Sequence, residues 1–197
     1  MDENVGRIIN ALKANDLFEN TIVVFTSDHG ICMGAHNQPG KDIFYEESMR
    51  IPMIISWPEK IKPRKDKQLM IAFADLYPSL LSMMGFQKEI PETVQTFDLS
   101  QEILGKTPKD IVQPYYFVQY DNHSTGYRGL RTARYTFVVH ATNGKIDETV
   151  LYDRSNDPYQ IHNIARRSPK QVGQFYKQLK TWLNQTNDSF TNYLTIQ

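Results

Sequence analysis

Apolar positions in the first part of the chain follow two patterns, one typical of a helix and one typical of buried strands. Between residues 2 and 15 apolar side chains return every three or four positions, and Asp2 is placed to cap a helix over this range. Residues 21–25 and 52–58 are short, continuous runs of β-branched and other apolar residues. Such runs are typical of strands that are buried on both faces of a parallel sheet, so we predict two strands of one sheet.

A second helix is predicted to begin at Asp75, which lies at a capping position shortly before a proline in the first turn. Its apolar stripe is formed by Leu80, Leu81 and Met84, and Gly85 ends it. This helix would cover a face of the sheet to which the two strands belong.

The later part of the chain changes to a pattern of short strands. The runs 115–120, 130–140 and 149–153 alternate or are rich in β-branched and aromatic residues, which predicts a small antiparallel sheet. The pair Asn143-Gly144 lies between two of these runs, but it is not expected to form a minimal two-residue hairpin loop. A strong helical stripe over residues 169–186 predicts a long helix that covers one face of this sheet.

These patterns indicate two domains of an α/β protein. Residues 86–114 are interrupted by prolines around a short helical piece near residues 99–104, and the boundary is placed there. Residues 1–110 are predicted to form part of an α/β domain. Residues 111–197 are predicted to form a small α+β subdomain with an antiparallel sheet and a covering helix.

Composition excludes several classes of protein. The 197 residues include 22 basic and 22 acidic residues, so no net field attracts nucleic acid. The single cysteine, Cys32, excludes an internal disulfide framework. The polar N-terminus contains no apolar signal core, and no apolar stretch approaches the roughly 20 residues that span a bilayer. We therefore expect neither a nucleic-acid partner nor a membrane partner, and this chain indicates no location.

Candidate chemistry begins directly after the first predicted strand. Asp28 and His29 follow it without a spacer, at the strand end where α/β proteins usually bind ligands, and a carboxylate and an imidazole could share a cation there. Lys41 comes after a loop rich in turn residues and could bind an anionic ester as a point charge. Taken alone, the tripeptide Asp28-His29-Gly30 is more simply a polar turn, because such tripeptides arise by chance. A single loop lysine such as Lys41 is usually a solvated surface residue. His36 alone is also more often a hydrogen-bonding loop residue.

In order and spacing these residues resemble the downstream half of the active-site region in type I sulfatases, members of the alkaline phosphatase superfamily. The resemblance is carried by Phe25-Thr26-Ser27-Asp28-His29-Gly30, by Gly34-Ala35-His36, by Lys41, and by the stretch from Tyr45-Glu46-Glu47-Ser48 to Ile55. Residues 127–135 and 151–165 are similar to the C-terminal subdomain of the same enzymes.

The resemblance implies roles for these residues. Asp28 would be a metal ligand, His29 would lie beside the metal, and Lys41 would contact the sulfate group. His36 would be a structural or substrate-lining residue. Calcium is the expected metal, although calcium prefers oxygen ligands and a histidine suits manganese or zinc better. The implied fold is the C-terminal part of an alkaline-phosphatase-like mixed sheet flanked by helices, spanning residues 1–110.

The chain departs from the family pattern at the nucleophile. The family converts a cysteine in a Cys-x-Pro/Ala-x-Arg motif to formylglycine and holds its metal with a further pair of aspartates, and these 197 residues contain neither feature. Cys32 has no such motif and is interpreted as a loop residue. The chain is therefore expected to be an incomplete portion of a periplasmic, secreted or lysosomal enzyme, in which an upstream complementary segment supplies formylglycine.

The second domain offers candidate substrate contacts. His123 lies in a polar loop after a predicted strand, and Arg128 and Arg131 follow it closely. An imidazole and a guanidinium there could bind sugar hydroxyls or a carboxylate, although a solvated loop with surface arginines is an equally good reading.

Three functions follow as hypotheses. The first is a sulfatase that hydrolyses a sulfated sugar, glycan or other sulfate ester. The second is a phosphodiester or phosphonate monoester hydrolase of the same superfamily, because a metal and a lysine serve phosphoryl transfer equally well. The third is a catalytically silent truncated or assembly module, which would expose apolar surface and associate with itself or with a partner segment.

Overall fold

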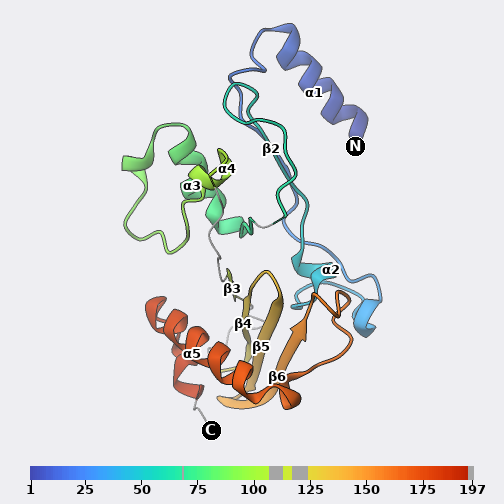
Figure 1. The fold of residues 1–197 in the computed structure, drawn as a ribbon, viewed down its shortest axis with the longest axis vertical. Helices are drawn as coiled ribbons and strands as arrows, with labels where there is room; N and C mark the ends of the chain where they lie inside the picture. The colour runs from blue at the N-terminus through green and yellow to red at the C-terminus, as the bar shows by residue number, and fades with distance from the viewer. Residues whose placement is uncertain (68, 107–112, 117–123, 195–197) are drawn as a thin grey trace. The chain divides into compact units, whose positions relative to one another are not determined.

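A computed structural model describes residues 1–67, 69–106, 113–116 and 124–194 (Figure 1). By contacts within the chain it divides into two compact units, which are described separately. The first comprises Met1–Asp28 and Ile51–Lys109, and the second comprises His29–Arg50 and Asp110–Gln197. Residues 29–50 thus belong to the unit that carries the C-terminal sheet. Contact units within one chain do not define the domains of a longer protein, so the division at residue 110 stays a prediction.

The first unit begins with helix α1, Asp2–Ala14, and a two-stranded sheet. Met1 occupies the cap position, so the predicted capping role of Asp2 is wrong. Strands β1, Val23–Thr26, and β2, Met53–Ser56, pair antiparallel, with Val24 opposite Ile55. The prediction of two parallel strands is therefore wrong as well. A continuous apolar run reports how much of a strand is buried, and it carries no information on the direction of its neighbour.

The rest of the first unit is helical, with η2 over Phe73–Asp75, α3 over Leu76–Met83, η3 over Gln87–Glu89 and α4 over Ser100–Ile103. Asp75 lies at the start of α3 as predicted, and its carboxylate accepts hydrogen bonds from two backbone amides. The predicted apolar stripe is shifted, because Met84 is 51% exposed while Met83 is buried. In the described part of the chain, no helix has the length and apolar composition that a membrane crossing requires.

The second unit is built on a four-stranded antiparallel sheet in the order β3-β4-β5-β6, as Figure 1 shows. The strands are Gln113–Tyr116, Gly126–Arg131, Tyr135–Thr142 and Lys145–Asp153. The predicted antiparallel sheet is confirmed, but the run 130–140 is two strands joined by a turn rather than one strand. Of the predicted run 115–120, residues 117–120 lie outside the described residues.

The turn between β5 and β6 corrects a further prediction. Thr142 pairs with Lys145, so Asn143 and Gly144 alone form a two-residue hairpin loop. Both have positive φ angles, 50° and 76°, the combination that a type I′ turn requires and that asparagine and glycine adopt most readily. The predicted strand 149–153 begins earlier in the structure, because residues 145–148 also belong to β6. The loop between β5 and β6 is therefore shorter than the sequence pattern predicts.

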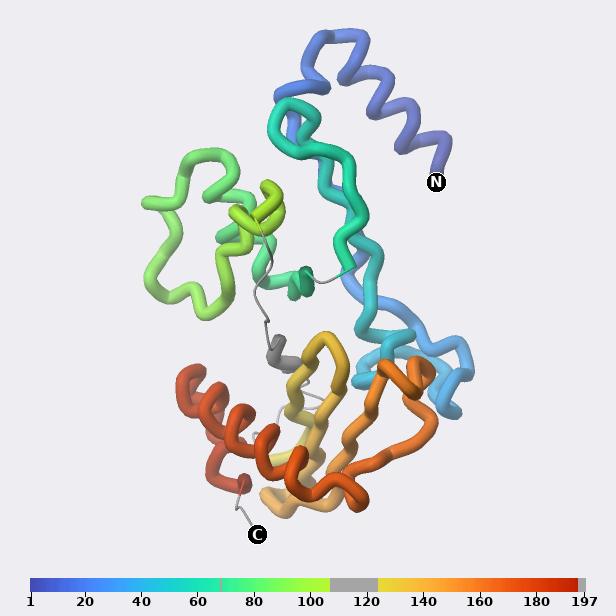
Figure 2. Tube along the Cα trace, viewed as in Figure 1, coloured from blue at the N-terminus to red at the C-terminus, as the bar shows by residue number. Residues whose placement is uncertain are grey.

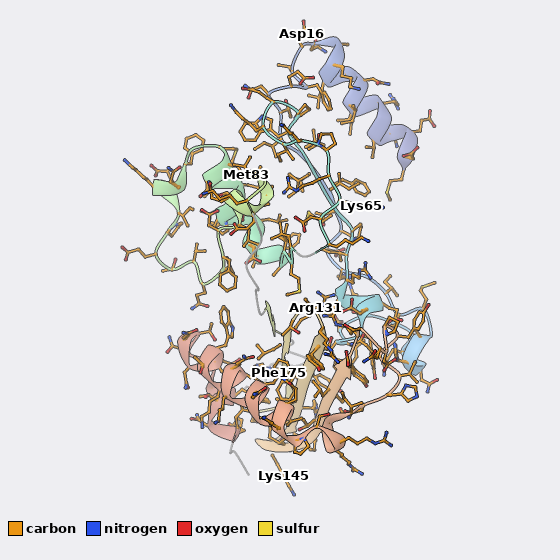
Figure 3. All side chains as sticks on the ribbon, viewed as in Figure 1. Asp16, Lys65, Met83, Arg131, Lys145 and Phe175 are labelled. Carbon is orange, nitrogen blue, oxygen red and sulfur yellow. The ribbon has the colours of Figure 1, made fainter. Side chains whose placement is uncertain are left out.

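The sheet of the second unit is covered on both faces (Figure 2). Helix α5, Pro169–Gln185, packs Phe175, Leu179 and Leu183 against one face, where Phe137 of β5 is fully buried. Figure 3 labels Phe175 on the side of α5 toward the strands. The predicted covering helix is confirmed. Short helices η4, Ala165–Arg167, and η5, Ser189–Tyr193, flank α5.

Residues 29–50 cover the other face, with η1 over Ala35–Asn37 and α2 over Glu46–Met49. Cys32, Ile43 and Phe44 of this segment form one apolar cluster with Val138 and Tyr152 of the sheet, among others. Alternating side chains of a strand point to opposite faces, which is why Val138 meets this segment while its neighbours meet α5. The loop that contains Lys41 is therefore carried by the C-terminal sheet, an arrangement that the sequence pattern does not indicate.

Candidate functional site

The first candidate residues follow β1, and the boundary between the two units falls between them. Asp28 closes the first segment of the first unit, where the hydroxyl of Ser27 lies 3.4 Å from its Oδ1 atom. His29 begins the second unit, and its Nδ1 atom lies 3.0 Å from the carbonyl oxygen of Gly30. Because a carbonyl oxygen can only accept, this contact favours the tautomer that is protonated at Nδ1 and leaves Nε2 as an acceptor.

Lys41 lies against that acceptor nitrogen. Its Nζ atom is 2.6 Å from Nε2 of His29, although the two residues are twelve positions apart. Since the ammonium group has only donors, it donates a charge-assisted hydrogen bond to the imidazole. Lys41 is exposed, so its remaining donors can meet a ligand from outside. The structure thus brings together two of the residues that the sequence singles out, one cation and one imidazole.

His36 is in the same loop but has different partners. Its ring stacks on that of Tyr45 with centroids 3.6 Å apart and planes within 1°, and its Nε2 atom lies 3.2 Å from Oε2 of Glu47. The side chain is only 8% exposed. These contacts hold the loop together, while a role in substrate binding stays a prediction. Tyr45 and Glu47 lie within the motif that carries the family resemblance, but the sequence predicts no role for either, because their pairing with His36 depends on how the loop folds back.

Gly30 fixes the start of this loop. Its backbone N–H donates to the carbonyl oxygen of Ser48 at 2.8 Å, and a Cβ atom added to it would lie 2.0 Å from the carbonyl oxygen of Glu47. No Cβ atom tolerates so short a contact with backbone, so only glycine allows this close approach.

We expect Gly30→Ala to loosen the loop and to lower the free energy of unfolding of the second unit by about 1–3 kcal/mol, the usual cost of overpacking. Urea denaturation measures this effect. Gly6→Ala is the matched control, because nothing lies within 4 Å of the Cβ position at Gly6. Equal stability of the two variants would contradict the close approach.

Arg128 is enclosed rather than open to a ligand. Its Nε atom donates to Oδ2 of Asp188 at 2.6 Å, its Nη1 atom donates to the carbonyl oxygen of Tyr127, and its guanidinium lies over the ring of Phe190. Only 2% of the side chain is exposed. These contacts give Arg128 a structural role, and its predicted part in substrate binding stays without support from the structure. His123 lies outside the described residues.

Cys32 is a core residue. It is 3% exposed and packs with Phe44 and Val150. Burial, together with the charge of Glu47, raises the pKa of its thiol above the ordinary value, which disfavours the thiolate that a nucleophile needs. The sequence interpretation that Cys32 is not the nucleophile therefore agrees with its surroundings.

The described residues include no group of three or more His, Cys, Asp or Glu side chains that could hold a metal ion. The pair Asp28 and His29 offers two donors of the right kind, a carboxylate oxygen and an imidazole nitrogen. The hydrogen bond from Nδ1 of His29 to a backbone carbonyl is the contact that normally orients a histidine ligand and makes Nε2 the binding atom. In this structure the lone pair of Nε2 accepts from Lys41, so a metal at Nε2 would displace that contact. The donor chemistry therefore fits a divalent metal whose other ligands come from elsewhere.

Comparison with known proteins gives one consistent result. Residues 34–189 match the family model described as N-sulphoglucosamine sulphohydrolase, C-terminal. The chain is 33% identical to an endo-4-O-sulfatase of Bacteroides thetaiotaomicron, over 95% of this chain and 40% of that protein. It is also 33% identical to an N-acetylglucosamine-6-O-sulfatase of the same organism, over 96% of this chain and 34% of that protein. The chain thus spans well under half the length of these curated relatives.

Solved structures agree with the sequence relatives. A crystal structure from Bacteroides fragilis whose name assigns it to the sulfatases (yidJ) is 72% identical, with a TM-score of 0.96 over 99% of this chain and 42% of that one. A structure in complex with its substrate D-glucosamine-2-N,6-O-disulfate is 30% identical, with a TM-score of 0.81 over 95% of this chain and 39% of that one. A phosphonate monoester hydrolase of Agrobacterium radiobacter has a TM-score of 0.80 at 24% identity, which shows the shared fold alone.

Proposed function

Because this chain belongs to the sulfatase family within the alkaline phosphatase superfamily, we propose that it supplies the anion-binding side of a site that hydrolyses sulfate esters. The observation that carries the proposal is the contact of 2.6 Å between Lys41 and His29 in the second unit. It places an exposed ammonium group beside an oriented imidazole, in the segment that directly follows Asp28 and β1.

In this proposal Lys41 binds the sulfate group of the ester. Its ammonium group donates hydrogen bonds to the non-bridging oxygens and stabilises the negative charge that develops there as the ester bond breaks. In the structure the contact with His29 restricts the rotamers of a long and otherwise mobile side chain, which keeps the ammonium group at the site before the metal and the anion bind.

Asp28 and His29 are proposed as two of the metal ligands, and Lys41 would release Nε2 of His29 when the metal binds, because that nitrogen has one lone pair. A bound divalent metal would withdraw charge from the sulfate oxygens. Calcium is the proposed ion, and manganese or zinc is the alternative that an imidazole ligand favours. The nucleophile, formylglycine in this family, has no counterpart among these 197 residues, so we propose that another segment provides it.

The proposed substrate class is a sulfated sugar. Of two relatives at 33% identity, one is named an endo-4-O-sulfatase and the other an N-acetylglucosamine-6-O-sulfatase, and a structure at 30% identity was solved with D-glucosamine-2-N,6-O-disulfate. These names differ in the sulfate position, so the proposal extends to the class of substrate and not to one position on the ring.

A hybrid enzyme tests the proposal against its alternatives. In it, this chain replaces the matching 42% of the Bacteroides fragilis protein, which is 72% identical over that region. We expect the hybrid to hydrolyse an aryl sulfate with a kcat/KM at least about a hundredfold above that for a phosphate diester or a phosphonate monoester, a difference of about 2.7 kcal/mol in transition-state binding.

The purified chain alone is the negative control, because it contains no Cys-x-Pro/Ala-x-Arg motif. Faster turnover of the phosphate diester or the phosphonate would replace the sulfatase proposal with the phosphoesterase alternative. An inactive but folded hybrid would favour the catalytically silent module.

A further inference from the structure

Helix α2 connects the loop that carries His29 and Lys41 to the C-terminal sheet, and two consecutive glutamates of α2 have different partners. Glu46 binds Arg131 at the end of β4 and Arg154 directly after β6, whereas Glu47 lies against His36 of the loop. One short helix therefore contacts both the scaffold and the loop that the scaffold supports.

Glu46 is the contact to the scaffold. Its Oε1 atom accepts from Nε of Arg131 at 3.0 Å and its Oε2 atom accepts from Nη2 at 2.8 Å, which is the bidentate geometry of a strong arginine–carboxylate pair. A second guanidinium, that of Arg154, lies 3.7 Å from Oε1. The backbone N–H of Glu46 also donates to Oε1 of Gln160 at 2.7 Å, and Gln160 is 1% exposed.

The charge of Glu46 is maintained by these partners. Burial alone would raise the pKa of this carboxyl group, but the hydrogen bond from Arg131 and the charges of Arg131, Arg154 and Arg50 outweigh it and hold the pKa below its ordinary value. The side chain of Glu46 is only 14% exposed, so water screens the contact weakly. Loss of this one charge would leave two guanidinium groups without their shared anion.

The other contacts of α2 lead back to the loop. The carbonyl oxygen of Ser48 accepts from the backbone N–H of Gly30, the residue next to His29. The carboxylate of Glu47 lies against the ring of His36, which is midway along the loop. Both attachments depend on where α2 is placed, and Glu46 is the ionic contact that ties α2 to the sheet.

We propose that Glu46 is a positioning residue for the pair of His29 and Lys41, acting through the attachment of α2 to Arg131 and Arg154. Glu46 reaches neither of the two side chains itself. It fixes the helix that holds the loop at Gly30 and at His36, and the loop in turn holds the Lys41 ammonium against the imidazole of His29. The importance given to Lys41 rests on the proposed function, whereas the positioning is a property of the loop itself.

Amide hydrogen exchange and the ¹⁵N signals of the His29 ring test this inference on the full 197-residue chain, without any measurement of activity. In Glu46→Gln we expect the amides of Gly30 and Cys32, which are hydrogen-bonded to Ser48 and Gly40, to exchange at least about tenfold faster. The His29 ring signals should move from those of one tautomer toward an average. Amides of β5 should keep their wild-type exchange rates.

Three further variants sharpen the test. Glu92→Gln makes the same chemical change at an exposed site and should behave as wild type. Phe175→Leu weakens the packing of α5 on the opposite face of the sheet, so it should accelerate exchange in β5 without a selective effect on Gly30. Arg131→Lys keeps the positive charge but removes the bidentate pair, and it should accelerate amide exchange in the loop by about threefold. This variant keeps the inference testable if Glu46→Gln does not fold.

Wild-type exchange at Gly30 and an unchanged His29 signature in both Glu46→Gln and Arg131→Lys would overturn the inference. The inference would also be overturned if Phe175→Leu produced the same faster exchange at Gly30 and Cys32 and the same change in the His29 ring signals. These changes would then report a general loss of stability of the second unit. Failure of the hybrid enzyme to hydrolyse sulfate esters would leave these signals unaffected, so the two proposals can fail separately.

Discussion

Replacement of Asp188 by alanine is expected to lower the free energy of unfolding of the second unit by about 3–5 kcal/mol. Its carboxylate is the anion beside Arg128, whose guanidinium is 2% exposed and lies over Phe190. Without Asp188 this buried cation loses the carboxylate that lies 2.6 Å from its Nε atom, and the loss of one partner of a buried ion pair is among the costliest changes in a protein interior. The same carboxylate also accepts from the backbone N–H of Phe190 at the start of η5, so a helix cap is lost as well.

Urea denaturation of Asp188→Ala measures this loss, with Asp147→Ala as the matched control. Asp147 also pairs with a basic side chain, that of His140, but it is 44% exposed. Its replacement should cost no more than about 1 kcal/mol, as is usual for exposed pairs. The double replacement Arg128→Met with Asp188→Leu should recover much of the lost stability, because neither charge then remains buried. Equal stability of Asp188→Ala and Asp147→Ala would show that the Arg128 contact is not structural.

Local features of the fold could be predicted from the sequence because they depend on neighbouring residues. The apolar stripes predict the helices α1 and α5, the sequence places Asp75 at a capping position, and the structure confirms these predictions. Strand direction could not be predicted, since the antiparallel pairing of β1 with β2 depends on the path of the chain between them. The pair Asn143-Gly144 is itself typical of a two-residue hairpin. The sequence does not show that the strand continues at Lys145, so the minimal hairpin is not predicted.

The candidate site divides in the same way. The order and spacing of Lys41 and His29 in the motif predict that both belong to one candidate site, but their direct contact is a finding of the structure. Glu46 and Arg131 are 85 positions apart, and Arg128 and Asp188 are 60 apart. No periodicity links residues at such separations, so Arg128 and Arg131 could be read equally well as surface groups or as ligand contacts.

Lys41→Met is expected to lower kcat/KM for a sulfate ester by about a hundredfold to a thousandfold in the hybrid enzyme, the usual cost of removing one group that stabilises developing charge. Methionine keeps much of the length and the apolar stem of the lysine side chain, so the packing of the loop should change little. The ammonium group donates to His29 and is expected to donate to the sulfate, and both interactions are lost. Lys60→Met is the matched control, because Lys60 is 49% exposed in the first unit and pairs only with its neighbour Glu59 in the described structure.

The kcat/KM of the hybrid enzyme for an aryl sulfate, with and without Lys41→Met, tests the central claim most directly. The account predicts measurable hydrolysis by the unsubstituted hybrid, the same rate within about threefold for Lys60→Met, and a fall of at least about a hundredfold for Lys41→Met. A Lys41→Met enzyme that keeps its kcat/KM within about threefold of the unsubstituted hybrid would contradict the assignment of Lys41 to the sulfate-binding site.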